Sequence, residues 1–462
     1  MNGLTSSRSP WWWVPSLYFA EGIRNRYHLM ERFPYFMVNN ISVTMFTRMG
    51  VPNGEMALFT SLIYLPWMIK PFWSPFVDII RTKRWWIVAM QILMSVAFIL
   101  LTLSIPHPAT TLIAEKQVPV SMFTLTLIFF VLTAFASATH DIAADGFYML
   151  ANDKEQQSFF VGIRSTAYRI SSVFCQGLLV FIAGLLEKSS GDIPTAWQIT
   201  VALAAAIFCL VTLWHYFALP RISSDAERTA GTDAKETAVP TTGSSDASRI
   251  LREFGRTFIT FFAKPGAWLA IVFMLLYRLP EAFLIKMINP FLLDPISKGG
   301  LGLATEEVGL VYGTIGVIAL TVGGILGGIA ASRWGLRKSL WPMAACMTLP
   351  CLTVLYLSIF LPSSLMTIAV CVAIEQFGYG FGFTAYMLYM MYFSEGEFTT
   401  AHYAICTGFM ALSMMLPGMV AGYLQEAVGY EGFFIIVMVC CLATLVVTRL
   451  AQKHVDADYG KK

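Results

Sequence analysis

Long apolar runs separated by short polar turns occupy most of the chain. A membrane-spanning helix needs about 20 consecutive apolar residues, and runs of that kind recur from one end of the sequence to the other. The pattern predicts an all-α membrane protein with twelve transmembrane helices, at approximately residues 11–49, 54–77, 85–105, 120–147, 158–186, 196–218, 265–294, 304–331, 339–360, 364–393, 399–425 and 430–448.

The first of these spans is interrupted by polar residues. The stretch "FAEGIRNRYHLMERFPYFMVNN", residues 19–40, places mostly polar side chains between two apolar runs. As one straight helix, residues 11–49 would be about 58 Å long, which exceeds the thickness of a bilayer. We expect the membrane-spanning part to begin near Arg32–Phe33, with residues 21–31 at the cytoplasmic surface. A bulge in a helix that keeps both ends, or an artefact of the gene model, would also account for the pattern.

A polar segment divides the predicted spans into two groups of six. Residues 220–256, "PRISSDAERTAGTDAKETAVPTTGSSDASRILREFGR", contain almost no large apolar side chains and are rich in Ser, Thr, Ala, Gly and charge. This composition is typical of a flexible linker. The sequence therefore predicts an N-terminal six-helix bundle at 1–219, a cytoplasmic linker at 220–256 and a C-terminal six-helix bundle at 257–462.

The distribution of Lys and Arg predicts that both termini are cytoplasmic. Cytoplasmic loops carry an excess of these residues, and with the N-terminus inside, the outer loops hold only Arg48, Lys116, Lys188 and Lys298. The inner segments then hold Arg8, Arg81, Lys83, Arg84, Lys154, Arg221, Arg228, Lys235, Arg249, Arg252, Arg256, Lys264, Arg333, Arg337, Lys338, Arg449, Lys453, Lys461 and Lys462.

Composition agrees with a membrane protein and argues against several other classes. The chain is 56% hydrophobic and 13% charged, whereas a soluble domain carries about 25% charged residues. Its net charge of +3 gives no reason to expect a nucleic-acid partner. The eight cysteines lie inside apolar runs without the spacing of metal ligands or paired loops. With no phosphate-binding loop, HExxH motif or nucleophile elbow either, we expect no enzymatic activity, cofactor or metal.

Spans 4 and 5 carry charges that are unusual for membrane helices. Asp141 and Asp145 are four residues apart in "SATHDIAADGFYML", so they share one helix face. Arg164 and Arg169 lie in "GIRSTAYRISS", at similar depth on the next helix. The charges form either a structural cluster that holds the bundle together or a site at which an arginine also binds an anionic substrate.

Span 7, "LLYRLPEAFLIKMINPF", combines charges with helix-breaking prolines. Arg278 and Glu281 are three residues apart and can pair locally. Pro280 and Pro290 interrupt the backbone hydrogen bonds, which is tolerated where the backbone lines a cavity. The pair is therefore interpreted either as cavity-lining or as purely local.

Span 10, "AIEQFGYGFGFTAYMLYMMYF", places Glu375 and Gln376 near mid-membrane. Its tyrosines are amphipathic, and Tyr379 and Tyr386 in particular would suit the wall of a sugar-binding site. Burial raises the pKa of a carboxyl group, so Glu375, Glu281 and Glu21 are all candidate proton carriers.

Span 2, "SLIYLPWMIKPFWSPFVD", contains three prolines and one lysine. Pro66, Pro71 and Pro75 are expected to kink the helix. Lys70 lies about a turn and a half from the cytoplasmic end and is expected to extend its ammonium group to the interface, although it is also a candidate for the substrate pathway.

Two features resemble a known transporter family. The short basic turns "DIIRTKRWW" (78–86) and "SRWGLRKSLW" (332–341) occupy equivalent places in the two six-span units, as in the major facilitator superfamily. In spans 1–5, "LYFAEG", "YLPWMIKPFWSPFVDI", "SATHDIAADGFYML" and "GIRSTAYRIS" resemble the muropeptide permease (AmpG-type) branch, which also includes acetyl-coenzyme A transporters. The inserted "IRNRYHLMER" departs from that branch and leaves Glu21 in doubt as a cavity residue.

The resemblance implies a monomeric, proton-coupled importer of peptidoglycan-derived muropeptides or related amino sugars in a bacterial inner membrane. Its partners would be the bilayer, protons and a small wall-derived glycopeptide or amino sugar. Two alternatives remain from the sequence. One is a transporter of another solute, such as acetyl-coenzyme A, and the other is a membrane sensor that binds wall fragments without moving them.

Overall fold

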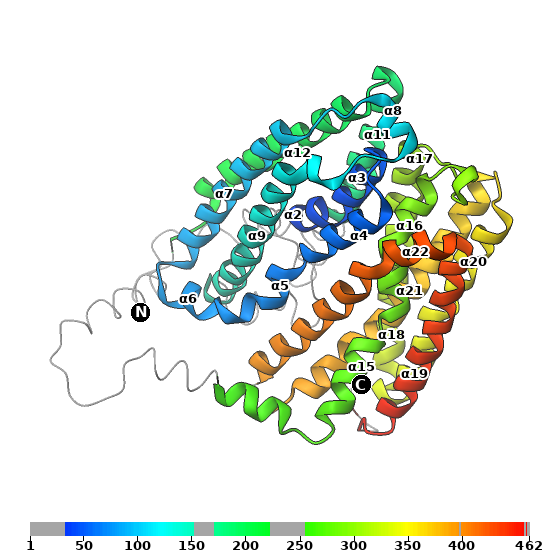
Figure 1. Cartoon of the computed structure of the whole chain (residues 1–462). Helices are drawn as coiled ribbons and strands as arrows, with labels where there is room; N and C mark the ends of the chain where they lie inside the picture. The colour runs from blue at the N-terminus through cyan, green and yellow to red at the C-terminus, as the bar shows by residue number, and fades with distance from the viewer. Residues whose placement is uncertain (1–32, 152–170, 222–254, 397–398, 457–458, 460–462) are drawn as a thin grey trace.

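A computed structural model describes residues 33–151, 171–221, 255–396, 399–456 and 459. These residues form helices and turns, with no strand among them (Figure 1). The all-α prediction is confirmed for this part of the chain. Glu21, Arg164, Arg169, the added residues of the first span and most of the linker lie outside it, so the predictions made for them stay untested.

The N-terminal half, residues 33–221, contains α-helices, two short 3₁₀ helices (η3, η4) and two π-helical segments (η2, η5). In chain order they are α2 Phe33–Phe36, η2 Met37–Ile41, α3 Ser42–Arg48, α4 Asn53–Leu62, α5 Leu65–Ile69, η3 Lys70–Phe72, α6 Ser74–Ile79, α7 Lys83–Ser104, α8 Thr110–Glu115, η4 Val120–Phe123, α9 Thr124–Ala151, η5 Val173–Leu179, α11 Val180–Ser190 and α12 Ile193–Ala218.

The C-terminal half, residues 255–456, contains one 3₁₀ segment (η6) and one π-helical segment (η7) among its α-helices. Its elements are α15 Ala267–Leu276, α16 Leu279–Leu293, η6 Ile296–Lys298, α17 Thr305–Val308, η7 Gly309–Gly316, α18 Val317–Trp334, α19 Leu336–Thr348, α20 Cys351–Phe360, α21 Leu365–Ser394 and α22 Thr399–Gln452.

Within the described residues, nine helices are long and apolar enough to cross a membrane. The last, His402–Gln452, covers two of the predicted spans, and Gly429 interrupts it with φ 73° and ψ 174°. A side chain rarely adopts such a positive φ, whereas glycine does so readily. The predicted total of twelve crossings is not reached by this count and stays a prediction.

The first two predicted spans do not meet the length criterion, for local reasons. The first is described only from Phe33 to Arg48, which is about 24 Å of helix. The second is divided into α4, α5, η3 and α6, with Pro66, Pro71 and Pro75 at the starts of the later segments. The kinks predicted from these prolines are therefore confirmed.

The distribution of polar and apolar side chains is that of a membrane protein. Large apolar side chains such as Leu103, Trp268 and Met366 are more than 70% exposed, while Arg278 and Glu375 are buried. In hydrocarbon, charged groups belong in the bundle interior. The buried apolar residues form three clusters: one consists of N-terminal residues together with Met415 of the C-terminal half, and two consist of C-terminal residues.

Glycines bring the two halves into backbone contact. A Cβ atom added to Gly313 of η7 would lie 1.9 Å from the carbonyl oxygen of Gln176 on η5. On α18, which directly follows η7, a Cβ at Gly323 would lie 2.2 Å from the carbonyl oxygen of Phe377 on α21. This second close approach is within the C-terminal half. These glycines allow close packing of helix backbones, and Gly313 packs specifically against the opposite half.

Candidate functional site

The two halves meet at one end of the molecule, where α3, α4, α11, α16 and α17 converge (Figure 1). We call this the closed end. Two polar clusters lie there, centred on Glu187 and on Asp294. Both join residues that are more than 100 positions apart in the chain, so neither could be found from local spacing.

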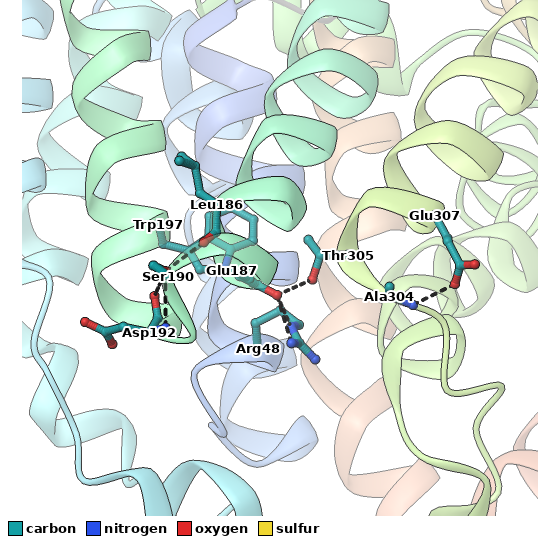
Figure 2. A network of polar contacts seen from close by, with 9 residues as sticks. All are labelled: Arg48, Leu186, Glu187, Ser190, Asp192, Trp197, Ala304, Thr305 and Glu307. Atoms are coloured by element: carbon teal, nitrogen blue, oxygen red, sulfur yellow. Dashed lines mark hydrogen bonds and ion pairs between the residues drawn. The ribbon is translucent and has the colours of Figure 1, made fainter.

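The first cluster surrounds the buried carboxylate of Glu187 (Figure 2). Arg48 places Nη2 at 2.8 Å and Nε at 3.0 Å from Glu187 Oε2, and Trp197 donates Nε1–H to Oε1 at 2.8 Å. From the other half, the Thr305 hydroxyl donates to Oε2 at 2.7 Å. Glu187 thus organises its own half and binds the opposite half through one hydroxyl.

The second cluster surrounds Asp294 at the end of α16. The Tyr430 hydroxyl donates to Asp294 Oδ2 at 2.6 Å, and Lys116 from the N-terminal half forms an ion pair with Asp294. Asn53, also from the N-terminal half, donates to Gln425 Oε1 at 2.8 Å and to the Tyr430 hydroxyl at 3.1 Å. Here several polar bonds cross between the halves.

Neither cluster is predicted by the sequence. Arg48 and Lys116 are expected there only as outer-loop charges, and Glu187 and Asp294 stand at helix ends, where an exposed carboxylate is ordinary. Glu187 and Asp294 are only 9% and 3% exposed. This burial would distinguish them from ordinary surface carboxylates, but it depends on the opposite half and cannot be read from the sequence.

Deeper in the C-terminal half, Arg278 and Glu281 form the predicted pair. Arg278 places Nη2 at 2.6 Å from Oε1 and Nε at 2.9 Å from Oε2, a two-bond geometry that strengthens such contacts. Arg278 also donates to the Tyr379 hydroxyl at 3.0 Å and lies 4.7 Å from the centre of the Phe383 ring. The pair is local, but it also connects span 7 to span 10.

Glu375 has a weaker set of contacts than Glu281. It is buried, and its Oε2 accepts a 2.8 Å hydrogen bond from the neighbouring Gln376 amide. No arginine or lysine of the described residues forms an ion pair with it. Of the two carboxylates, Glu375 is therefore the one without a cation that holds it ionised.

The tyrosines of span 10 do not form one wall. Tyr379 contacts Arg278, but Tyr386 is fully buried and donates its hydroxyl to the Met274 carbonyl at 2.8 Å. Tyr389 is buried in the same apolar core, and Tyr392 donates to the His454 carbonyl. In this conformation the Tyr386 hydroxyl is used in helix packing, and its assignment to the substrate pathway stays a prediction.

Lys70 is paired rather than extended toward the membrane surface. Its Nζ lies 2.6 Å from Asp141 Oδ2, and the Asp141 side chain is 3% exposed. Asp145 is also buried, one turn further along α9. Asp141 of span 4 therefore takes a partner from span 2, a contact that the spacing of charges in the sequence does not predict.

Between the halves lies a small polar region formed by spans 1, 2, 5 and 7. Asn40 donates to Gln176 Oε1 at 2.8 Å, and both border a cavity of about 10 Å³, room for about one water. Asn289 also borders that cavity. Lys286 of α16 reaches Thr60 of the other half, with Nζ 3.1 Å from Oγ1.

This arrangement suits binding and conformational change. Charged and amide side chains lie between the two halves, and Glu281 of span 7 and Glu375 of span 10 are buried in the C-terminal half. No group of three or more potential metal ligands occurs among the described residues.

Comparison with protein families gives a match over most of the chain. The family model described as "Major Facilitator Superfamily" matches residues 28–394. That range includes Arg48, Glu187, Asp294 and Thr305 of the closed end. It also includes the Arg278–Glu281 pair of span 7 and Glu375 of span 10.

Two relatives align over most of their length. "Putative transporter AmpG 4" of Rickettsia conorii is 26% identical over 447 residues, covering 93% of this chain and 98% of the relative. "Anhydromuropeptide permease" of Escherichia coli is 26% identical over 413 residues, covering 86% of this chain and 75% of the relative.

Solved structures share the fold at low sequence identity. The D-xylose–proton symporter matches with a TM-score of 0.68 at 9% identity, covering 98% of both chains. A bacterial homologue of the human lysosomal transporter Spinster matches with a TM-score of 0.62 at 14% identity, covering 96% of this chain and 94% of that one.

Proposed function

The chain belongs to the Major Facilitator Superfamily, and from this premise we propose that it is a proton-coupled importer of peptidoglycan-derived muropeptides or related amino sugars. The membrane-spanning transporter fold agrees with that of the solved structures. The substrate class is carried by the similarity to an anhydromuropeptide permease over most of both chains, and location in a bacterial inner membrane belongs to the same proposal.

The polar region between the halves supports such a substrate. Amides such as Asn40, Gln176 and Asn289 hydrogen-bond to the hydroxyl and amide groups of glycopeptides. Secondary transporters bind their substrates near the midplane, at the interface between repeats. If both termini are cytoplasmic, the closed end faces outward, and the present conformation blocks passage on that side.

The proposal is tested by uptake into proteoliposomes that contain the purified full chain. A radiolabelled anhydromuropeptide should accumulate when an inward proton gradient is imposed, and accumulation should collapse when a protonophore is added. Acetyl-coenzyme A, applied under the same conditions, should not accumulate. Saturable binding without uptake would favour the sensor alternative, and uptake indifferent to the gradient would contradict proton coupling.

We further propose that Glu375, rather than Glu281, takes up and releases the proton. Arg278 favours the ionised form of Glu281, whereas Glu375 has only an amide donor. Glu375→Gln should abolish gradient-driven accumulation and leave counterflow exchange intact, because exchange requires no net proton movement. Both are measured in the same proteoliposomes.

Glu281→Gln is the comparison variant. It leaves the Arg278 guanidinium buried without a carboxylate, a change that costs about 3–5 kcal/mol when a buried pair is broken. We expect less folded protein and a lower melting temperature. Full gradient-driven accumulation by Glu375→Gln would exclude Glu375 as the carrier.

A further inference from the structure

Lys286 carries a buried ammonium group that no carboxylate compensates. Its residue exposure is 5%, and its Nζ contacts are the Thr60 hydroxyl at 3.1 Å and the face of the Tyr64 ring at 5.6 Å. Among the described residues no carboxylate lies within ion-pair distance of it. The hydroxyl and the ring attract the cation, but neither neutralises it.

Other cations between or near the halves have a carboxylate partner. Arg48 contacts Glu187, Lys70 contacts Asp141, and Arg278 contacts Glu281. An unpaired charge at membrane depth is costly and is usually found where function requires it. The region around Lys286 is therefore short of one negative charge.

The surroundings of Lys286 offer further unused hydrogen-bonding groups. Ser61 Oγ and Asn289 Oδ1 are buried and make no hydrogen bond to any described residue. Asn289 lies three positions after Lys286, so the two side chains share a face of α16. Gly418 of α22 packs against the same place, since a Cβ there would lie 2.5 Å from Ser61 Oγ and 3.2 Å from Lys286 Cε.

The contact also crosses between the halves, because Lys286 belongs to α16 and Thr60 to α4. When the closed end opens, Lys286 must leave Thr60 and Tyr64 and face the space between the bundles. A solute that enters from that end then meets a cation with three available N–H donors.

We propose that Lys286 is the subsite for an anionic group of the transported solute, a carboxylate, and that it selects for charged over neutral forms of the solute. This inference rests on the proposed function, since it names a recognition element for a muropeptide, which carries carboxylates on its peptide. A bound carboxylate supplies the missing charge, so closure over Lys286 becomes more favourable when the anion is present.

The test compares two forms of one solute, an anhydromuropeptide with free carboxylates and the same compound with its carboxylates amidated. Uptake into proteoliposomes is measured for the wild type, Lys286→Met, Lys286→Arg and Lys188→Met. Lys188 is an exposed lysine in the last turn of α11, at the closed end, so its substitution controls for a general loss of positive charge.

We expect the wild type and Lys188→Met to prefer the carboxylate form. Lys286→Met should raise the KM for that form by about 10- to 100-fold, the range for a lost charged hydrogen bond, with little change for the amidated form. Lys286→Arg should retain the preference in part. An unchanged preference in a folded Lys286→Met protein would overturn the inference.

A second measurement does not depend on uptake. Without solute, Lys286→Met should have a higher melting temperature than the wild type, because it replaces an uncompensated buried charge by an apolar side chain of similar length. A lower melting temperature would mean that Lys286 stabilises the fold, and would overturn the inference. If the wild type transports neither solute form, the proposed function fails and the inference about Lys286 fails with it, whereas transport of both forms without a preference overturns the inference alone.

Discussion

Gly313→Ala should strongly disfavour the conformation in which the two halves are in contact at the closed end. The new methyl group would lie 1.9 Å from the Gln176 carbonyl oxygen and 2.5 Å from the Gly177 nitrogen. Both are backbone atoms of the opposite half, so no side chain can move aside to make room. The halves must separate for the methyl group to fit.

The size of the effect follows from the cost of overpacking. Added methyl groups in a close-packed interior cost about 1–3 kcal/mol, and a bias of that size shifts a two-state equilibrium by about 5- to 150-fold. We expect a corresponding fall in the rate of muropeptide uptake. The helix itself should not suffer, because alanine has a higher helix propensity than glycine.

Gly328→Ala on the same transmembrane segment is the matched control. A Cβ at Gly328 meets nothing within 4 Å, so uptake should be unchanged. Spin labels are placed at two exposed positions at the closed end, position 188 in the last turn of α11 and position 298 in η6. They should report a longer distance in Gly313→Ala only. Equal distance distributions for both alanine variants would contradict the interpretation of Gly313 as an inter-half contact.

Glu187→Ala should destabilise the folded protein and open the closed end. It removes the acceptor for Arg48, Trp197 and Thr305 together. Breaking a buried ion pair costs about 3–5 kcal/mol, and we expect the lower part of that range because the Arg48 side chain is 28% exposed and can be hydrated. The melting temperature in detergent should fall clearly.

Thr305→Val separates the conformational effect from the effect on folding. The substitution removes only the bond that crosses between the halves and leaves Glu187 with Arg48 and Trp197 (Figure 2). A hydrogen bond to a charged group contributes about 1.5–3 kcal/mol. The spin-label distance at the closed end should therefore lengthen while the melting temperature changes little. A Glu187→Ala protein with wild-type melting temperature and distance would show that this cluster has no role in closure.

The positions of the helices could be predicted from the sequence. Apolar runs of sufficient length dictate where the chain can cross a membrane, because only there are the backbone and side chains both stable in hydrocarbon. The prolines of span 2 predicted the breaks that separate α4, α5, η3 and α6. The total number of crossings was harder to predict, since it depends on a first span described only from Phe33 onward.

Local chemistry in the site could also be predicted. Arg278 and Glu281 are three residues apart on one helix, and helical geometry alone brings them together. The burial of Glu375 likewise followed from its position inside an apolar run. Such predictions succeed because the interacting groups share an element whose geometry is fixed in advance.

The tertiary structure alone decided which distant groups meet. Lys70 pairs with Asp141, Glu187 accepts from Thr305, and Asn53 donates to Tyr430. Hydrophobic periodicity tells which face of a helix is buried, but not which helix covers that face or in what register. For the same reason the sequence predicts Tyr386 as a substrate contact, whereas packing places its hydroxyl on the Met274 carbonyl. The sequence determined where charge would be buried, and the packing of the two halves determined that no carboxylate of the described residues pairs with Lys286.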